Sequence, residues 1–255
     1  MGTCLTVDQG NSTVGLVLWS VEGPTARVLA RPAGLGAVAG SLTGALHGAP
    51  AGRPDRVLVS SVADPARRTS LQDELEQRFG AWELPAHGLG LAIRHPETCG
   101  LDRLFAARAA AALAPAGAVV VDCGTALTVD LVRDGVFEGG AIAPGPSLLV
   151  RALAEGGAQL HAVRARPGAP ALGRETAEAL EAGVVVGLRG AARELVAELL
   201  AGAGGGLPVL VTGGARGLLL EPTPCLPGPP VVRPDLVHEG LLVAGLPGTR
   251  LPEVP

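Results

Sequence analysis

The sequence contains no lysine and no tyrosine, and among its 255 residues are a single methionine and a single asparagine. Without lysine the chain cannot form a P-loop or a lysine Schiff base, which excludes two common ways of handling phosphates and carbonyl substrates. Alanine, glycine, arginine, leucine and proline are abundant instead, as a GC-rich coding sequence would produce. The one asparagine, Asn11, is therefore informative, because the chain avoids this residue everywhere else.

Charge, hydropathy and cysteine spacing argue against several kinds of partner and location. The net charge is −4 and there is no basic run, so we expect neither nucleic acid nor an anionic membrane as a partner. The apolar stretches are too short or too interrupted to span a bilayer, and the N-terminus starts directly with a strand pattern in place of a signal peptide. The four cysteines are scattered without a Cys-x-x-Cys pair, and the five histidines form no compact metal motif. We therefore expect a cytoplasmic protein with reduced thiols.

Hydrophobic periodicity predicts an α/β protein. After an opening strand, further strands are expected over 14–19, 25–30, 56–62, 118–122, 126–132, 136–142 and 208–212. Helices are expected over 37–47, 65–79, 100–113, 146–155, 176–200 and 236–245. Each half then has three strands, a helix, a strand and a helix. This order predicts two related lobes, 1–115 and 116–255, each with a mixed sheet and flanking helices.

Two strands end in the same short motif, Asp8-Gln9-Gly10 in the first half and Asp122-Cys123-Gly124 in the second. Glycine lets the backbone bend closely around a phosphate, and successive N–H groups in such a turn form a concavity for anions. Additional hydrogen-bond donors follow the aspartates, namely Asn11, Ser12, Thr13, Thr125 and Thr128. The carboxylates of Asp8, Asp122 and Asp130 are hard oxygen ligands for a cation.

A single motif of this kind would be interpreted as an ordinary turn in which aspartate bonds its own backbone. Two motifs in matching positions favour phosphate binding. Because ligands of such folds bind in a crevice between the parts, we expect a nucleotide to be held between the two lobes.

Three further motifs are open to two interpretations, and a fourth suggests a pocket. Gly100-Leu101-Asp102-Arg103 starts a helix, where Asp102 is either a charge that favours the helix N-terminus or a general base, with Arg103 binding an anionic group. The segment 139–145 is either a tight turn or a close approach to ligand. Thr176 is either the cap of the long helix or a site residue. Thr212-Gly213-Gly214 follows a buried strand and could border an adenosine pocket.

In their order and spacing these motifs resemble those of type III pantothenate kinases, which belong to the superfamily of acetate and sugar kinases, heat-shock proteins and actin-like ATPases. The resemblance covers most of the chain and also includes Ser60-Ser61-Val62. It implies duplicated actin-like (ribonuclease H-like) lobes and ATP-dependent phosphorylation of the pantothenate hydroxyl, the first step towards coenzyme A. It also implies a homodimer with the substrate pocket near the subunit interface.

The resemblance assigns roles to individual residues. The ATP phosphates would be bound by Asp8, Gln9, Gly10, Asn11, Ser12, Thr13, Val14 and Gly15, with Thr125 as a further ATP contact. Asp122 would bind the monovalent cation, K⁺ or NH₄⁺, and Asp8 is a candidate ligand for the Mg²⁺ that accompanies ATP. Pantothenate would be bound by Gly100, Leu101, Asp102, Arg103 and Thr176, with Asp102 as the proton acceptor.

The sequence departs from the family pattern at two positions. Ile93 stands where members often carry a tyrosine, seven residues before Gly100, so one substrate contact is missing or replaced. Ser12 stands where threonine is usual, which retains the hydroxyl.

Two other functions stay open on the sequence. The chain could be a non-catalytic regulatory or accessory relative, although the intact Asp8, Asp102, Asp122 and Thr125 argue against a degenerate site. It could also be a kinase for another small alcohol or sugar. The Gly100–Arg103 motif argues against this reading, whereas Ile93 leaves room for it.

Overall fold

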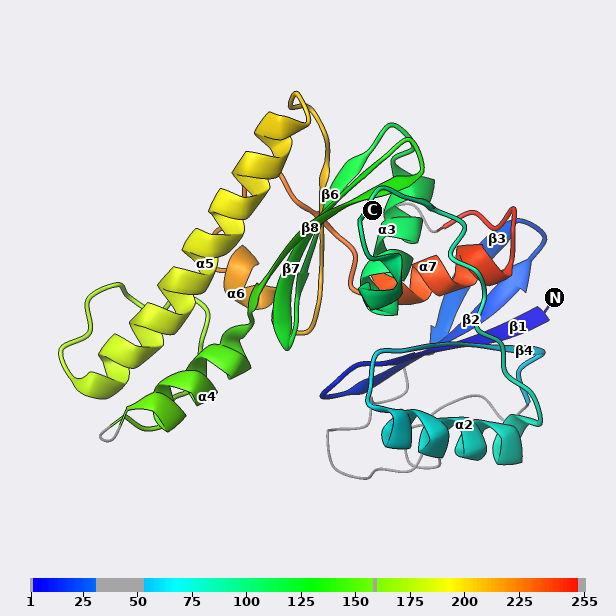
Figure 1. Cartoon of the computed structure of the whole chain (residues 1–255), viewed down its shortest axis with the longest axis horizontal. Coiled ribbons are helices and arrows are strands. Elements are labelled where there is room, and N and C mark those ends of the chain that lie inside the picture. Colours follow the sequence, from blue (N-terminus) through cyan, green and yellow to red (C-terminus); the bar gives the residue numbers. More distant parts are fainter. Residues whose placement is uncertain (1, 31–52, 158–159, 252–255) are drawn as a thin grey trace. The chain divides into compact units, whose positions relative to one another are not determined.

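The computed structural model describes residues 2–30, 53–157 and 160–251. The described chain forms two compact units (Figure 1). Of the described residues, the first unit comprises those within Met1–Pro115, Gly135–Phe137 and Asp235–Pro255, and the second comprises those within Ala116–Asp134 and Glu138–Pro234. The C-terminal segment that the sequence assigns to the second lobe thus packs with the first unit. The functional lobes 1–115 and 116–255 stay a prediction.

A four-stranded sheet with the order β3-β2-β1-β4 forms the centre of the first unit. Its strands are β1 (Gly2–Gln9), β2 (Val14–Glu22), β3 (Thr25–Ala30) and β4 (Arg56–Ser61). β1 pairs antiparallel with β2 and parallel with β4. Helix α2 (Pro65–Phe79) begins where the Asp64 carboxylate accepts the N–H of Arg67 at 3.1 Å, and it ends at Gly80, whose φ of 76° is readily adopted by glycine.

The second sheet repeats this topology. Its order is β10-β9-β6-β7-β8-β5, so the stretch β8-β7-β6-β9 corresponds to β3-β2-β1-β4. Its strands are β5 (Gly90–Leu91), β6 (Ala118–Cys123), β7 (Ala126–Arg133), β8 (Val136–Pro144), β9 (Val209–Thr212) and β10 (Val231–Val232). β6 pairs antiparallel with β7 and parallel with β9, as β1 does with β2 and β4. The repeated order confirms the predicted duplication of a mixed α/β unit.

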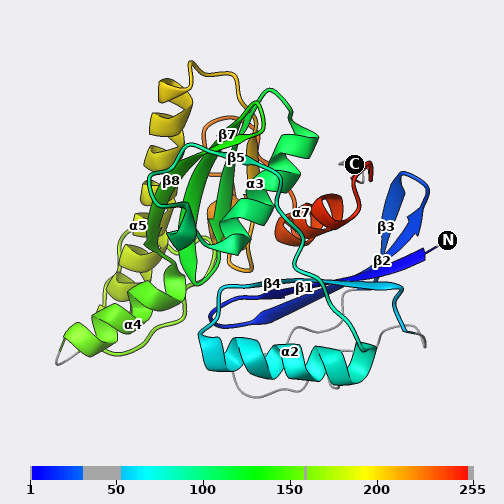
Figure 2. The same ribbon diagram turned by 45° about the vertical axis from the view of Figure 1, so that its right-hand side comes forward.

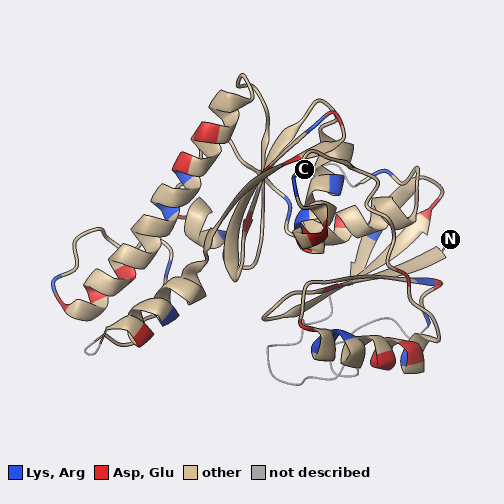
Figure 3. Ribbon diagram, viewed as in Figure 1, with Lys and Arg blue, Asp and Glu red and all other residues tan. Residues whose placement is uncertain are grey.

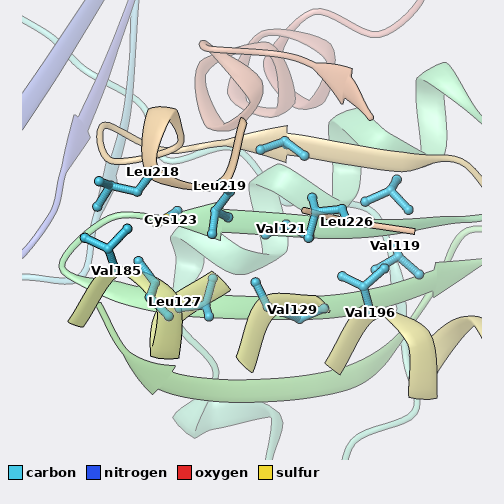
Figure 4. Packing of buried hydrophobic residues seen from close by; sticks show 14 of the residues in the cluster. Val119, Val121, Cys123, Leu127, Val129, Val185, Val196, Leu218, Leu219 and Leu226 are labelled. Carbon is cyan, nitrogen blue, oxygen red and sulfur yellow. The ribbon is translucent and has the colours of Figure 1, made fainter. Parts of the chain in front are cut away.

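Strand alternation decides which side of each sheet is core. In the first unit Leu5 and Val7 pack with Leu71 and Leu75 of α2, which lies along one face of the sheet (Figure 2). In the second unit, β6, β7 and β9 present apolar side chains to α5 (Thr176–Gly202) and α6 (Gly217–Leu220), as Figure 4 shows for Val121, Val129 and Val185. Because neighbouring residues of a strand point to opposite faces, Asp8 and Asp122 lie on the other face of their sheets.

Most expected elements are present within a residue or two. The helices over 65–79 and 236–245 and the strand over 25–30 have the expected bounds. The hairpin turn at Asp134-Gly135 is also confirmed, with φ of 50° and 74° as a type I′ turn requires. The loop expected from Leu84 to Glu97 contains β5 and the short 3-10 helix η1 (Pro96–Thr98). The helix predicted over 37–47 lies outside the described residues.

The remaining helices are α3 (Leu101–Leu113), α4 (Pro146–Gly156) and α7 (Leu236–Gly245). Figure 3 shows both acidic and basic residues along α2 and along α5, so neither helix carries charge of a single sign. Among the helices in the described ranges, none is both long and apolar enough to cross a membrane.

Helix α7 packs against α3 and against strands β1 and β4 in the first unit. At the crossing, a side chain on Gly240 would collide with the carbonyl oxygen of Phe105 on α3. We expect Gly240→Ala to lower the free energy of unfolding by about 1–3 kcal/mol, the usual cost of overpacking a core. Gly190→Ala on α5 is the matched control: it has open space, and alanine there should raise stability by about 0.5–1 kcal/mol. Equal effects of both substitutions in urea unfolding would contradict this packing.

Candidate functional site

In the first unit, Asp8 lies at the end of β1 between two strands. Its register partners are Gly15 on β2 and Ser60 on β4. Residues in register share one face of a sheet, so the Ser60 hydroxyl lies beside the carboxylate. That hydroxyl is buried and has no hydrogen-bond partner among the residues that the structure describes. A buried hydroxyl of this kind calls for a polar partner, and an ion or a water molecule is one that suits it.

The turn after Asp8 is closed by its own backbone. The N–H of Gly10 donates to the carbonyl of Thr13 at 2.9 Å, and Asn11 and Thr13 are exposed. The carbonyl of Asn11 accepts from Nη1 of Arg67 at 2.6 Å, which ties the turn to the first turn of α2. The turn therefore has a fixed backbone with exposed polar side chains at its tip.

Two of the predicted ATP-binding residues have side chains that serve the fold. Gln9 is buried, where its amide donates to the carbonyl of Arg67 at 3.1 Å and accepts from the Ser61 hydroxyl at 2.7 Å. Val14 packs in the apolar core under the sheet. Any contact of Gln9 or Val14 with a phosphate would thus use backbone atoms.

Asp102 lies in the first turn of α3, where its carboxylate folds back over the helix start. Its Oδ1 accepts the N–H of Arg103 at 2.8 Å, and a side chain on Gly100 would collide with the same oxygen. Burial raises the pKa of the Asp102 carboxyl, and the hydrogen bond and positive charge of Arg103 only partly oppose this rise. A carboxylate with a raised pKa is a stronger base than an ordinary surface aspartate, as a general base requires.

The Gly100–Arg103 motif meets the end of β4. A Cβ on Gly100 would be 3.6 Å from a methyl group of Val62, which directly follows the Ser60-Ser61 pair. The guanidinium of Arg103 lies 5.4 Å from the centre of the Phe137 ring, within the range of a cation–π interaction. Within the first unit, the end of β4 thus lies beside both the Asp8 turn and the start of the helix that carries Asp102.

In the second unit, three motifs meet at Asp122. Register pairs it with Thr128 on β7 and with Thr212 on β9. The chain after β9 passes so close that a side chain on Gly213, whose φ is 92°, would collide with Asp122 Oδ1 and the Cys123 carbonyl. Glycine at 213 is thus required both by backbone conformation and by space.

The Gly139–Gly145 segment reaches the same turn. The N–H of Gly145 donates to the carbonyl of Thr125 at 3.1 Å, and a side chain on Gly145 would collide with the carbonyls of Gly124 and Thr125. Earlier in the segment, within β8, a side chain on Gly140 would collide with Asp130, which is 2% exposed. Glycine is therefore required at both positions by close approaches to protein atoms within the fold, and the predicted approach to ligand stays a prediction.

Thr176 is the first residue of α5 and is exposed. The interpretation of Thr176 as the helix cap is wrong, because the cap position is Glu175 and its side chain makes no capping bond. The helix start is held instead by Gly173, which packs against Glu178 and Ala179, and by the Arg174 N–H, which donates to the Glu178 carboxylate at 2.8 Å. The threonine hydroxyl is consequently not needed as a cap.

The oxygen atoms around Asp122 are of the type that a hard cation binds. The Asp122 carboxylate and the Cys123 carbonyl, which both lie against Gly213, are oxygen ligands of the kind that bind Mg²⁺ or K⁺. At the neighbouring position, burial and then the Asp122 charge raise the pKa of the Cys123 thiol to about 12, which disfavours its thiolate form. Within the described residues no three His, Cys, Asp or Glu side chains form a ready-made metal cluster, so a bound cation would share its ligands with backbone or substrate oxygens.

The sequence alone did not indicate that Ser60 and His238 lie near the Asp8 turn, or that Thr212 lies beside Asp122. Ser60 and Thr212 are equivalent, since each is the parallel-strand partner of the aspartate in its own sheet. A serine or threonine at the end of the fourth strand of each half is the sequence signal that could have found them. No local signal links His238 to β1, because their contact joins residues 232 positions apart.

Comparison with solved structures supports the fold. A Baf family protein from Campylobacter jejuni is 18% identical and has a TM-score of 0.56, with 93% of this chain and 96% of that one covered. The ethanolamine utilization protein EutJ from Carboxydothermus hydrogenoformans is 16% identical with a TM-score of 0.53, covering 96% and 90%. At these identities the likeness concerns the duplicated α/β fold alone.

Comparison of sequences identifies the family. The family model described as type III pantothenate kinase matches residues 4–198. A type III pantothenate kinase from Halorhodospira halophila is 42% identical over 200 residues, covering 74% of this chain and 76% of the relative. Another from Alkalilimnicola ehrlichii is 38% identical over 245 residues, covering 93% and 95%. The chain belongs to the type III pantothenate kinase family.

Proposed function

We propose that this protein phosphorylates pantothenate with ATP to give 4′-phosphopantothenate, the first step of coenzyme A biosynthesis. The observation that carries the proposal is the Asp-x-Gly turn found at the same position of both repeated sheets in a chain of this family. Phosphoryl transfer requires mainly positioning and neutralisation of charge. Backbone N–H groups, carboxylate-bound cations and arginine can supply both without lysine.

The ATP phosphates bind at the Asp8 turn in this proposal. Asn11, Ser12 and Thr13 supply side-chain donors at its exposed tip, while Gln9, Gly10, Val14 and Gly15 contribute backbone, with Thr125 as an additional contact. A bound Mg²⁺ would neutralise phosphate charge, and Asp8 with the neighbouring Ser60 hydroxyl offers oxygen ligands for it, directly or through water. Asp122 and adjacent carbonyls would hold K⁺ or NH₄⁺.

Asp102 is the proposed catalytic base. The pantothenate hydroxyl loses its proton to the Asp102 carboxylate as its oxygen attacks the γ-phosphorus and the bond to the ADP oxygen breaks. Gly100 and Leu101 line the pantothenate site, and Arg103 pairs with the pantothenate carboxylate. Thr176 adds a hydroxyl to the same site. Ile93 supplies no hydroxyl, so the contact made by the usual tyrosine is replaced by an apolar one.

The working form is proposed to be a cytoplasmic homodimer. Helix α4 has no buried residue, and the exposed apolar side chains of Ile142, Leu153 and Val186 would be covered in a dimer. The described cysteines are all free thiols, as expected in a reducing compartment.

A regulatory role is not favoured. Similarity to the Baf family protein shows the fold alone, and the relatives at 38–42% identity are named as kinases. A kinase for another small alcohol stays the second candidate because of Ile93.

The test is ADP release with Mg²⁺ and ATP, with and without pantothenate, in K⁺ and then in Na⁺ buffer. We expect pantothenate to stimulate ADP release in K⁺ and much less in Na⁺. If pantothenate never stimulates release in K⁺, the proposed activity is rejected. Turnover of a different alcohol alone would favour the second candidate.

A further inference from the structure

His238 of α7 reaches the face of the first sheet that carries Asp8. The residue is only 8% exposed, and its Nδ1 lies 3.0 Å from the hydroxyl oxygen of Thr6 on β1. Thr6 and Asp8 are two positions apart on one strand and therefore share a face. The ring is thus buried next to the base of the turn that we assign to the ATP phosphates.

The surrounding hydrogen bonds fix the orientation of this ring. The Thr6 hydroxyl donates to the Val17 carbonyl at 3.2 Å and accepts from the indole N–H of Trp19 at 2.9 Å. With the single hydroxyl proton directed to the Val17 carbonyl, Nδ1 of His238 donates to Thr6 in this arrangement. The imidazole is therefore held with Nδ1 toward β1, and its Nε2 edge is directed elsewhere.

The Nε2 edge faces Gly15. A Cβ built on Gly15 would be 2.8 Å from Nε2, closer than carbon and nitrogen tolerate without a shift. Gly15 does not have a positive φ, so its backbone does not require glycine. Space for the imidazole is the physical reason for glycine here. Because Gly15 is the register partner of Asp8, the ring occupies the side-chain position next to the Asp8 carboxylate.

We infer that His238 is a positioning residue for the ATP-phosphate turn, with its Nε2 edge supporting the Asp8–Gly15 end of the hairpin and Gly15 leaving room for it. The inference rests on the proposed assignment of this turn to ATP. Helix α7 is well suited to the task, because its Gly240 packs directly on the α3 backbone at Phe105 and fixes the helix in place.

The first test replaces His238 and measures nucleotide binding directly. We expect His238→Leu and His238→Asn to weaken binding of Mg·ADP about tenfold by calorimetry and to raise KM for ATP similarly, with KM for pantothenate within about twofold. Glutamine can place an amide where Nε2 was, so His238→Gln should restore most of the affinity. The control His87→Leu, on a loop of the same unit, should change neither constant.

The second test is a double-mutant cycle. Gly15→Ala alone should weaken Mg·ADP binding, because the new methyl group meets the ring. Combining it with His238→Ala removes the clash, so the double variant should bind more tightly than Gly15→Ala alone. Additive losses would overturn the inference.

The outcomes separate this inference from the proposed function. Wild-type protein that binds Mg·ADP but never phosphorylates pantothenate would reject the function and leave the His238 test valid. An active wild type with unchanged nucleotide binding in His238→Leu and His238→Asn would reject the inference. Wild-type protein that binds no nucleotide would overturn both. A fall in thermal stability with unchanged affinity would indicate a purely structural ring.

Discussion

Replacing Asp102 by asparagine should lower kcat for pantothenate phosphorylation about 100- to 10,000-fold, the range that a general base contributes. The Asp102 carboxylate is the proposed acceptor of the hydroxyl proton, and asparagine keeps its shape without basicity. The affinity for Mg·ATP should stay within about twofold, because the carboxylate folds over the start of α3 and its hydrogen bond to Arg103 N–H is local. Single-turnover kinetics and calorimetry on the same preparation would measure the two effects.

The same substitution should not destabilise the protein. The folded-state pKa of Asp102 is raised, so the folded state binds its proton more tightly than the unfolded state does. For a carboxyl group this means that stability falls as pH rises from the unfolded pKa through the folded one, and stays lower above it. Asparagine has no charge to bury, so Asp102→Asn should equal or exceed wild-type stability at neutral pH while losing activity.

The control is Asp73→Asn on the exposed side of α2, which makes the same chemical change away from the motif. It should leave kcat and stability near wild type. In the wild type, kcat/KM should fall on the acid side at a pH above the ordinary titration range of aspartate, and this acid limb should be missing from the residual activity of Asp102→Asn. If Asp102→Asn retains wild-type kcat, Asp102 is not the base.

Asp122→Ala should abolish activation by potassium. The Asp122 carboxylate and the Cys123 carbonyl both lie against Gly213, so alanine removes the charge and leaves this carbonyl as a neutral oxygen for a monovalent ion. We expect activity in K⁺ buffer to fall by about 100-fold or more, comparable to the loss of one preorganised electrostatic contact. Activity in Na⁺ buffer, which we expect to be low in the wild type, should change much less.

Glu198→Ala, on the exposed surface of α5 in the same unit, is the control for loss of one negative charge. It should preserve the ratio of activities in K⁺ and Na⁺. Potassium activation that survives unchanged in Asp122→Ala would reject the cation role. Far-ultraviolet circular dichroism of both variants would establish that the second unit remains folded.

Local sequence patterns were sufficient where an element's own residues define its boundaries. The helix Pro65–Phe79 has apolar residues at fours, a capping aspartate before it and a glycine after it, and its expected bounds are those of the structure. The Asp134-Gly135 turn is also defined locally. An Asp-Gly pair favours a type I′ turn, and both φ angles are positive in the structure. Such features depend on neighbours within a few residues.

Other features had no local signal. β5 and β10 are two residues long, and periodicity cannot be recognised over two residues; their strand geometry comes from β8 and β9, with which they pair. Threonine is a residue type that often caps helices, but Thr176 is the first residue inside α5. The close packing of Gly173 against Glu178 and Ala179 defines the start of the helix.

By itself, the sequence determined the α/β class, the duplication and the two aspartate turns, because these depend on local periodicity and on short motifs repeated in each half. Only the tertiary structure decided which atoms surround each aspartate. Register brings Ser60 and Gly15 beside Asp8, and Thr212 and Gly213 beside Asp122. The packing of α7 brings His238 to the first turn from the far end of the chain. Contacts of this kind depend on how strands pair and helices pack, which the spacing of residues along the chain does not specify.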